Sequence, residues 1–222
     1  MRRESQIKDN GYIEWLKSLG CIMYLPLSEN GDLQDRISGL SLQLTGNGSM
    51  EWDSTEQMYM ITHPSSVVYS YVAILDNGLD ATWFPDDNFT TIHSVKMITN
   101  SSSKYFNTID PNGNTDNTVF AISACYDGTG RTNAWPRTLA NVAYVCDHTN
   151  LTRHCYQDGG TFLSASEYAG NLPSNWSTQG TGITVGKNRS QYFYSSQYYM
   201  KEVYLFNKVL DLTTIRKIQG YE

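Results

Sequence analysis

The chain has 222 residues, which is long enough for one domain with a sizeable core, and it is rich in aromatic residues, with 16 Tyr, 7 Phe and 5 Trp. Only 17% of the residues are charged and the formal net charge is −6, so the overall field repels phosphate backbones and disfavours a nucleic-acid partner. No segment approaches the roughly 20 apolar residues of a membrane-crossing helix, and the polar N-terminus lacks the apolar stretch of a secretory signal, so we expect no membrane insertion and no export signal.

The first predicted element is a short helix over residues 10–19. Apolar side chains recur at helical spacing from Ile13 to Leu19, Asp9 and Asn10 are suited to cap the start, and Gly20 is suited to end the helix. Two placements of this helix stay open. It can pack against one end of the following domain, or it can act as an arm that docks on a neighbouring subunit.

A change of apolar period after this helix divides the chain. Alternation with a period of two replaces the helical spacing from Cys21 onward. We therefore predict an N-terminal arm over residues 1–20 and a single β-domain over residues 21–222. The chain shows no internal repeat that would divide this domain further.

Short alternating or aromatic-rich runs, separated by turn residues, follow one another through the rest of the chain. They predict strands at 21–27, 40–45, 49–53, 58–62, 89–98, 105–109, 119–126, 140–147, 153–158, 162–166, 183–186 and 198–207. Residues 67–75 are apolar without a clear period. Asp211 is suited to cap a final helical turn. So many short strands without helices between them imply an all-β fold, an antiparallel β-sandwich of the jelly-roll type.

The cysteines give no sign of a zinc site or a disulfide. None of them forms a Cys-x-x-Cys pair, and in a hairpin around residues 148–150 the two nearest ones would be offset in register. We expect four buried free thiols, at Cys21, Cys125, Cys146 and Cys155.

Several segments resemble one known family. Residues 199–211, Tyr-Met-Lys-Glu-Val-Tyr-Leu-Phe-Asn-Lys-Val-Leu-Asp, are similar to its signature strand, and residues 142–159, 182–186, 23–27 and 35–46 match its other segments in the same order. The chain thus resembles the concanavalin A-like lectin/glucanase superfamily, in particular the laminin-G-like jelly-roll domain of bacterial surface and bacteriophage structural proteins. This resemblance implies a lectin-like sandwich whose loops carry function.

One motif matches the catalytic pattern of the glucanases that share this fold. Glu51, Asp53 and Glu56 fit Glu-x-Asp-x-x-Glu. A retaining glycosidase needs two carboxyl groups about 5 Å apart along a cleft. Here the motif falls on an early edge strand, and Glu56 is expected at a hairpin tip. We therefore predict no catalytic residues and no enzyme activity.

Calcium is the only cofactor that the resemblance suggests. Related sandwiches bind it through loop carboxylates, for which Asp32 and Asp35 are the candidates, but neither lies in the dense acidic loop that calcium prefers. We expect no cofactor and leave calcium open.

Carbohydrate binding is a further expectation, because aromatic rings stack on sugars while amide and carboxylate groups hold the hydroxyls. The loop aromatics suited to this role are Trp83, Trp135, Trp176, Tyr192 and Tyr194. The alternative is that these rings cover the core or a subunit contact.

Two functional hypotheses follow. The first is a non-catalytic structural or adhesion protein of a bacteriophage virion, assembled in the host cytoplasm as an oligomer or within a larger assembly, with other structural subunits as partners. The alternative is a carbohydrate-binding module of the bacterial cell surface, with a surface glycan as its partner. A glycoside hydrolase is the hypothesis with least support.

Overall fold

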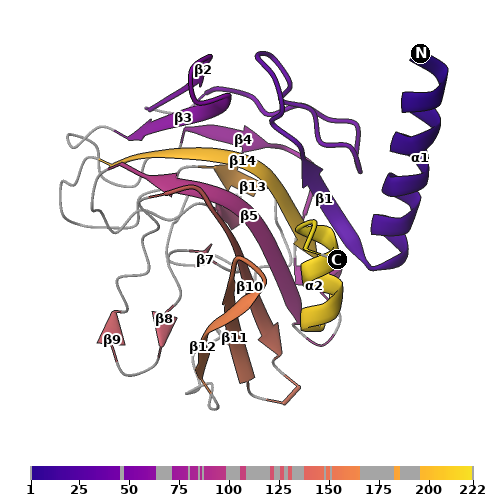
Figure 1. Ribbon diagram of the computed structural model, residues 1–222, viewed down its shortest axis with the longest axis vertical. Helices are drawn as coiled ribbons and strands as arrows, with labels where there is room; N and C mark the ends of the chain where they lie inside the picture. The colour runs from indigo at the N-terminus through magenta and orange to yellow at the C-terminus, as the bar shows by residue number, and fades with distance from the viewer. Residues whose placement is uncertain are drawn as a thin grey trace.

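A computed structural model shows a molecule built mainly of antiparallel strands, with one helix near each end of the chain (Figure 1). It describes residues 2–45, 48–63, 72–79, 81–84, 86, 88–98, 106–108, 121–122, 126–127, 130–131, 138–147, 149–150, 152–165, 183–185 and 196–221. None of the described helices combines the length and the apolar character needed to cross a membrane.

The largest unit is an eight-stranded sheet, here called the main sheet. In spatial order, its strands are β12 (Gly160–Ala165), β11 (Thr152–Gln157), β10 (Ala140–Asp147), β5 (Phe89–Met97), β14 (Ser196–Phe206), β3 (Met58–His63) and β2 (Ser49–Asp53). The eighth strand, β1 (Cys21–Leu25), also pairs with β14. Within the described residues, every pairing in this sheet is antiparallel.

A second, smaller sheet faces the main one. Its order is β4 (Ala73–Leu75), β13 (Ile183–Val185), β6 (Phe106–Thr108) and β7 (Ala121–Ile122). A separate pair joins β8 (Tyr126–Asp127) to β9 (Gly130–Arg131), and a 3-10 turn, η1 (Ala81–Trp83), lies between β4 and β5.

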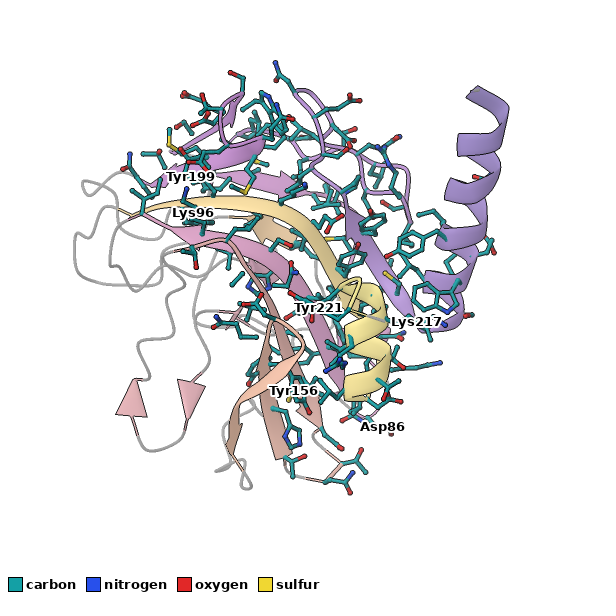
Figure 2. All side chains as sticks on the ribbon, viewed as in Figure 1. Asp86, Lys96, Tyr156, Tyr199, Lys217 and Tyr221 are labelled. Carbon is teal, nitrogen blue, oxygen red and sulfur yellow. The ribbon has the colours of Figure 1, made fainter. Side chains whose placement is uncertain are left out.

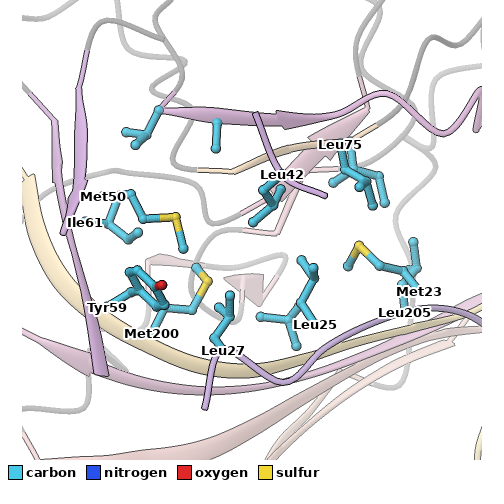
Figure 3. Packing of buried hydrophobic residues seen from close by; sticks show 14 of the residues in the cluster. Met23, Leu25, Leu27, Leu42, Met50, Tyr59, Ile61, Leu75, Met200 and Leu205 are labelled. Carbon is cyan, nitrogen blue, oxygen red and sulfur yellow. The ribbon is translucent and has the colours of Figure 1, made fainter. Parts of the chain in front are cut away.

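The alternation of side chains along β14 produces two cores. On the inner face of the main sheet, Tyr198, Met200 and Leu205 belong to a buried cluster that also contains Leu75 and Ile183 of the second sheet. Figure 3 shows this packing around Met23, Leu25 and Leu205. Burial of large apolar side chains between two sheets is the main stabilisation of such a sandwich.

The outer face of the main sheet is partly covered by two helices. α1 (Arg2–Ser18) contributes Leu16, and α2 (Leu212–Ile218) contributes Ile215 and Ile218, to a second buried cluster with Phe206 of β14. Asp211 caps α2, because its side chain accepts a hydrogen bond from the Thr214 backbone N–H at 2.7 Å, as the sequence predicted. The second half of α1, which carries the apolar residues, thus packs on the domain.

β14 contains a β-bulge at Glu202. Its register with β5 shifts between Lys201 and Val203, and Glu202 has a φ of 45°, in the left-handed region that non-glycine residues rarely adopt. On one side of the bulge β14 pairs with β3, and on the other side it pairs with β1. Because Met200 and Val203 both face the inner core, the two residues between them face outward.

The all-β antiparallel sandwich predicted from the sequence is confirmed, with two corrections. The first helix begins at Arg2 rather than at residue 10, so Asp9 and Asn10 lie within it and do not cap it. Residues 40–45 form no strand: Leu42 is buried, whereas Leu40 and Leu44 are exposed, and a single bridge joins Ser41 to Gln34.

Two of the predicted buried free thiols are confirmed, at Cys21 and Cys146. In the hairpin, Cys146 pairs with Arg153 while Cys155 pairs with Tyr144, so these two cysteines are offset in register as expected. Cys125 and the side chain of Cys155 lie outside the described part of the structure.

Candidate functional site

Trp83 lies at the end of η1, where the chain approaches the first residue of β5. The next residue, Phe84, is buried and packs edge-on against Phe89, with ring centroids 6.2 Å apart. This contact anchors the segment to the inner core. Trp83 itself is only half-buried against that core, so part of its indole remains accessible.

Hydrogen bonds join this segment to the turn between β10 and β11. The Asn88 side-chain amide donates to the Thr149 hydroxyl at 3.0 Å, and the Thr149 backbone N–H donates to Asn88 Oδ1 at 3.4 Å. Asp147 holds the turn by accepting from the Asn150 backbone N–H at 2.9 Å and from its side-chain amide at 2.7 Å. Two loops that are far apart in sequence therefore form one surface at this end of the main sheet.

An exposed carboxylate completes this surface, which we call the Trp83 surface: Trp83, Asp86, Asn88, Thr149 and Asn150. Asp86 is exposed and has a φ of 60° (Figure 2). A partly accessible indole with carboxylate, amide and hydroxyl groups on adjoining loops is the chemistry of a site for polar ligands that have an apolar face.

The structure describes one of the five predicted sugar-binding residues, Trp83. Trp135, Trp176, Tyr192 and Tyr194 lie outside the described residues. Trp83 is thus the one sequence-predicted ligand residue that the structure places, and the bonds between Asn88 of its segment and Thr149 of the β10–β11 turn became apparent only from the packing of the two loops.

The glucanase-like motif lies on the β2–β3 hairpin. β2 is an edge strand of the main sheet, as expected, and residues 54–57 form the turn that contains Glu56. Glu51 and Asp53 are two positions apart on β2 and share the outer face, while Trp52 packs toward the inner core. The motif therefore lies on the face of the main sheet directed away from the second sheet.

Two of these carboxylates are engaged in contacts across the main sheet. Asp53 accepts a hydrogen bond from the Tyr199 hydroxyl at 2.7 Å, and Glu56 forms an ion pair with Lys96 at 2.7 Å. The Lys96 ammonium also lies 5.4 Å from the centroid of the Tyr199 ring (Figure 2). These contacts tie the hairpin to β5 and β14.

The same contacts shift two pKa values. The hydrogen bond from Tyr199 is the main reason that the pKa of Asp53 is lowered, and the same bond raises the pKa of Tyr199 to about 12. Asp53 is therefore held as an acceptor and Tyr199 as a donor, which suits a structural link across the sheet.

Both calcium candidates are buried beside β1 and bonded to protein groups. Asp35 accepts hydrogen bonds from the backbone N–H groups of Tyr24, Ile37 and Ser38, at 2.8, 3.1 and 3.0 Å, and from the Ser38 hydroxyl. Asp32 accepts from Ser28 and forms an ion pair with Arg36.

Cation ligation by either carboxylate would have to replace these bonds. Within the described part of the chain, no group of three or more His, Cys, Asp or Glu side chains is arranged to hold a metal ion. Calcium at Asp32 or Asp35 stays a prediction.

Comparison with known proteins adds information on the fold. No protein-family model matches the sequence, and no curated protein is significantly similar to it. Among solved structures, the chain is similar to the binding domain of botulinum neurotoxin DC in complex with rat synaptotagmin II, with a TM-score of 0.61 and 12% identity over 91% of this chain and 51% of that chain.

Two further similar structures have the same low identity. A structure of botulinum neurotoxin type C, whose cell entry depends on interaction with two ganglioside molecules, has a TM-score of 0.58 and 12% identity over 93% of this chain and 52% of that one. The Trypanosoma rangeli sialidase in complex with sialic acid has a TM-score of 0.56 and 12% identity, and 90% of this chain covers 32% of the sialidase. The shared feature is the all-β sandwich. This chain spans about half the length of the neurotoxin chains and about a third of the sialidase.

Proposed function

We propose that this chain is a non-catalytic, lectin-like adhesion module whose Trp83 surface binds a glycan. The half-exposed Trp83, on the segment that continues through Asp86 to Asn88 at the end of the main sheet, is the observation that carries this proposal. Aromatic side chains supply the apolar contact with a sugar ring, and amide and carboxylate groups supply hydrogen bonds to its hydroxyls.

The structural neighbours support a glycan as the ligand class. The neurotoxin type C is described as dependent on ganglioside molecules, and the sialidase is described in complex with sialic acid. Both ligands are sialylated or sialic-acid sugars, so gangliosides and sialylated oligosaccharides are the first probes to use on this protein.

Replacement of Trp83 by alanine is expected to weaken binding of the best glycan at least about fivefold, because loss of a stacking ring costs on the order of 1 kcal/mol. Trp83→Phe, which keeps a smaller ring, is expected to retain part of the affinity. A glycan array should identify the probe, and isothermal titration should measure its Kd.

Tyr221→Ala is the matched control, since it removes an exposed aromatic ring beside the C-terminal end of α2 (Figure 2). It is expected to leave the Kd unchanged. Equal affinity of wild type and Trp83→Ala would rule out the Trp83 surface, and hydrolysis of the bound glycan that disappears in Glu51→Gln would rule out a non-catalytic module.

The biological setting that we propose is a virion, in which the module is one part of an oligomer or of a larger assembly with other structural subunits. The support for it is the similarity of residues 199–211 to the signature strand of laminin-G-like domains of such proteins. A bacterial cell surface is the alternative setting, and glycan binding suits it equally well. Detection of this chain by mass spectrometry of purified virus particles would favour the virion, and its detection on bacterial cells alone would favour the cell surface. Native mass spectrometry of the purified chain gives the oligomeric state.

A further inference from the structure

Three tyrosines from distant parts of the chain meet on the outer face of the main sheet. Tyr24 of β1 and Tyr204 of β14 are directly paired, and their rings stack at 4.4 Å with an interplanar angle of 8°. Tyr12 of α1 lies edge-on to Tyr24 at 5.9 Å, and its hydroxyl is 3.2 Å from the Tyr204 hydroxyl. We call these three residues the tyrosine cluster.

Trp15 of α1 extends this aromatic surface. Its ring centroid lies 5.5 Å from that of Tyr12, and the Lys217 ammonium of α2 lies 5.6 Å from the Trp15 ring. Tyr12, Trp15 and Tyr24 are all only half-buried. The Trp15 ring therefore already makes a cation–π contact with a lysine of the same chain.

Glu202 lies next to the tyrosine cluster, at the β-bulge. Its side chain is on the outer face, as is that of Tyr204 two residues later, because Val203 between them faces the inner core. Its charge raises the pKa of Tyr12, Tyr24 and Tyr204, although burial is the larger cause in each case. An effect on all three phenols indicates that the carboxylate is close to each of them.

The carboxylate of Glu202 lacks a partner among the residues that the structure describes. It is half-buried, it accepts no hydrogen bond from them, and it forms no ion pair with them. Burial raises its pKa, and Lys201 offsets this only in part. The nearby Arg36 is paired with Asp32. A desolvated carboxylate without a partner lowers the stability of the folded chain. A cationic group of a bound partner would supply the missing interaction, so this carboxylate is a candidate binding residue.

We propose that Glu202 and the tyrosine cluster form a docking site for an arginine side chain of a partner protein. A guanidinium is planar, so it can stack on a tyrosine ring while it donates two parallel hydrogen bonds to a carboxylate. The net charge of −6 favours approach of a basic segment, and partly accessible tyrosine and tryptophan are typical of protein interfaces. This site is separate from the Trp83 surface and does not depend on glycan binding.

The test uses the full chain and an acetylated, amidated peptide, Arg-Gly-Arg-Gly-Arg-Gly, titrated at low salt by isothermal titration calorimetry. Saturable binding is expected for the wild type, and Glu202→Gln is expected to weaken it at least about tenfold. The matched control is Glu51→Gln, which removes the same charge from an exposed position on β2 and is expected to change the Kd less than twofold.

Peptides and sugars of other chemistry decide between ligand classes. A peptide with Lys in place of Arg is expected to bind more weakly, because an ammonium cannot stack and donate in parallel. Binding of glucosamine oligomers that depends on Glu202, without binding of the arginine peptide, would overturn the proposal in favour of an amino sugar. Equal affinity of wild type and Glu202→Gln for the arginine peptide would overturn it as well.

A thermal melt separates binding from folding. Glu202→Gln replaces a desolvated charge with a neutral group of the same shape, so its Tm is expected to equal or exceed that of the wild type. A lowered Tm together with unchanged peptide binding would assign Glu202 a structural role and refute the docking site.

Discussion

Replacement of Asp35 by alanine is expected to lower the free energy of unfolding by about 3–5 kcal/mol, because several buried N–H groups lose their acceptor together. Asp35 is fully buried and accepts from the backbone N–H groups of Tyr24, Ile37 and Ser38. The Arg36 N–H donates to the Tyr24 carbonyl at 2.8 Å, so residues 35 and 36 together cover the edge of β1 that does not face β14. Urea denaturation at pH 7 measures the loss.

Asp76→Ala is the control for this prediction, because Asp76 is exposed, and its effect is expected to stay within about 0.5 kcal/mol. A loss below 1 kcal/mol for Asp35→Ala would show that the loop does not depend on these bonds. Thermal melts of the wild type and of Asp35→Ala, in EDTA and in calcium chloride, test for a bound cation. Calcium that raises the Tm of the wild type but not of Asp35→Ala would assign this carboxylate to a metal site.

Local sequence patterns predicted much of the fold because strands that are buried on one face carry their own signature. Residues 140–147 and 49–53 were predicted as strands from alternating side chains and from the turn residues beside them. The structure has strands with the same first and last residues. Alternation misled at residues 40–45, where Leu40, Leu42 and Leu44 would share one face. Only Leu42 reaches the core, since this segment lies beside β1 as a loop held by Asp35.

The sites were harder to predict, since they depend on contacts between distant segments. Trp83 was found from composition alone, but the hydrogen bond from Asn88 of the same segment to Thr149 depends on the packing of two loops. The tyrosine cluster joins residues 192 positions apart, and the bulge at Glu202 is a shift in the pairing of β14 with β5. Alternation along one segment indicates which residues share a face, but it does not indicate a bulge or the partner of a distant strand, so neither feature could be deduced.

Acid is expected to destabilise the protein through His93. This histidine lies on the inner face of β5, paired with Val142 of β10 and Val203 of β14, and only 2% of its surface is exposed. Burial lowers its pKa to about 4, whereas an unfolded chain has a histidine pKa of about 6.5. Between these values the unfolded chain binds a proton that the folded chain does not bind. Stability therefore falls as the pH decreases from about 6.5 to 4, and it is independent of this group above that range.

The size of this effect is about 3 kcal/mol at pH 4, since each pKa unit corresponds to about 1.4 kcal/mol. His93→Gln removes the titration and keeps a polar side chain, so its free energy of unfolding should depend less on pH between 4 and 6.5. Glu202 acts in the opposite direction: its raised pKa favours the folded state at low pH, so Glu202→Gln should steepen the acid loss. Urea denaturation of the wild type, His93→Gln and Glu202→Gln at pH 7, 5.5 and 4 measures the contribution of each group to the pH dependence. Parallel pH profiles for the wild type and His93→Gln would mean that His93 becomes protonated within the folded core, which would require the two sheets to part around it.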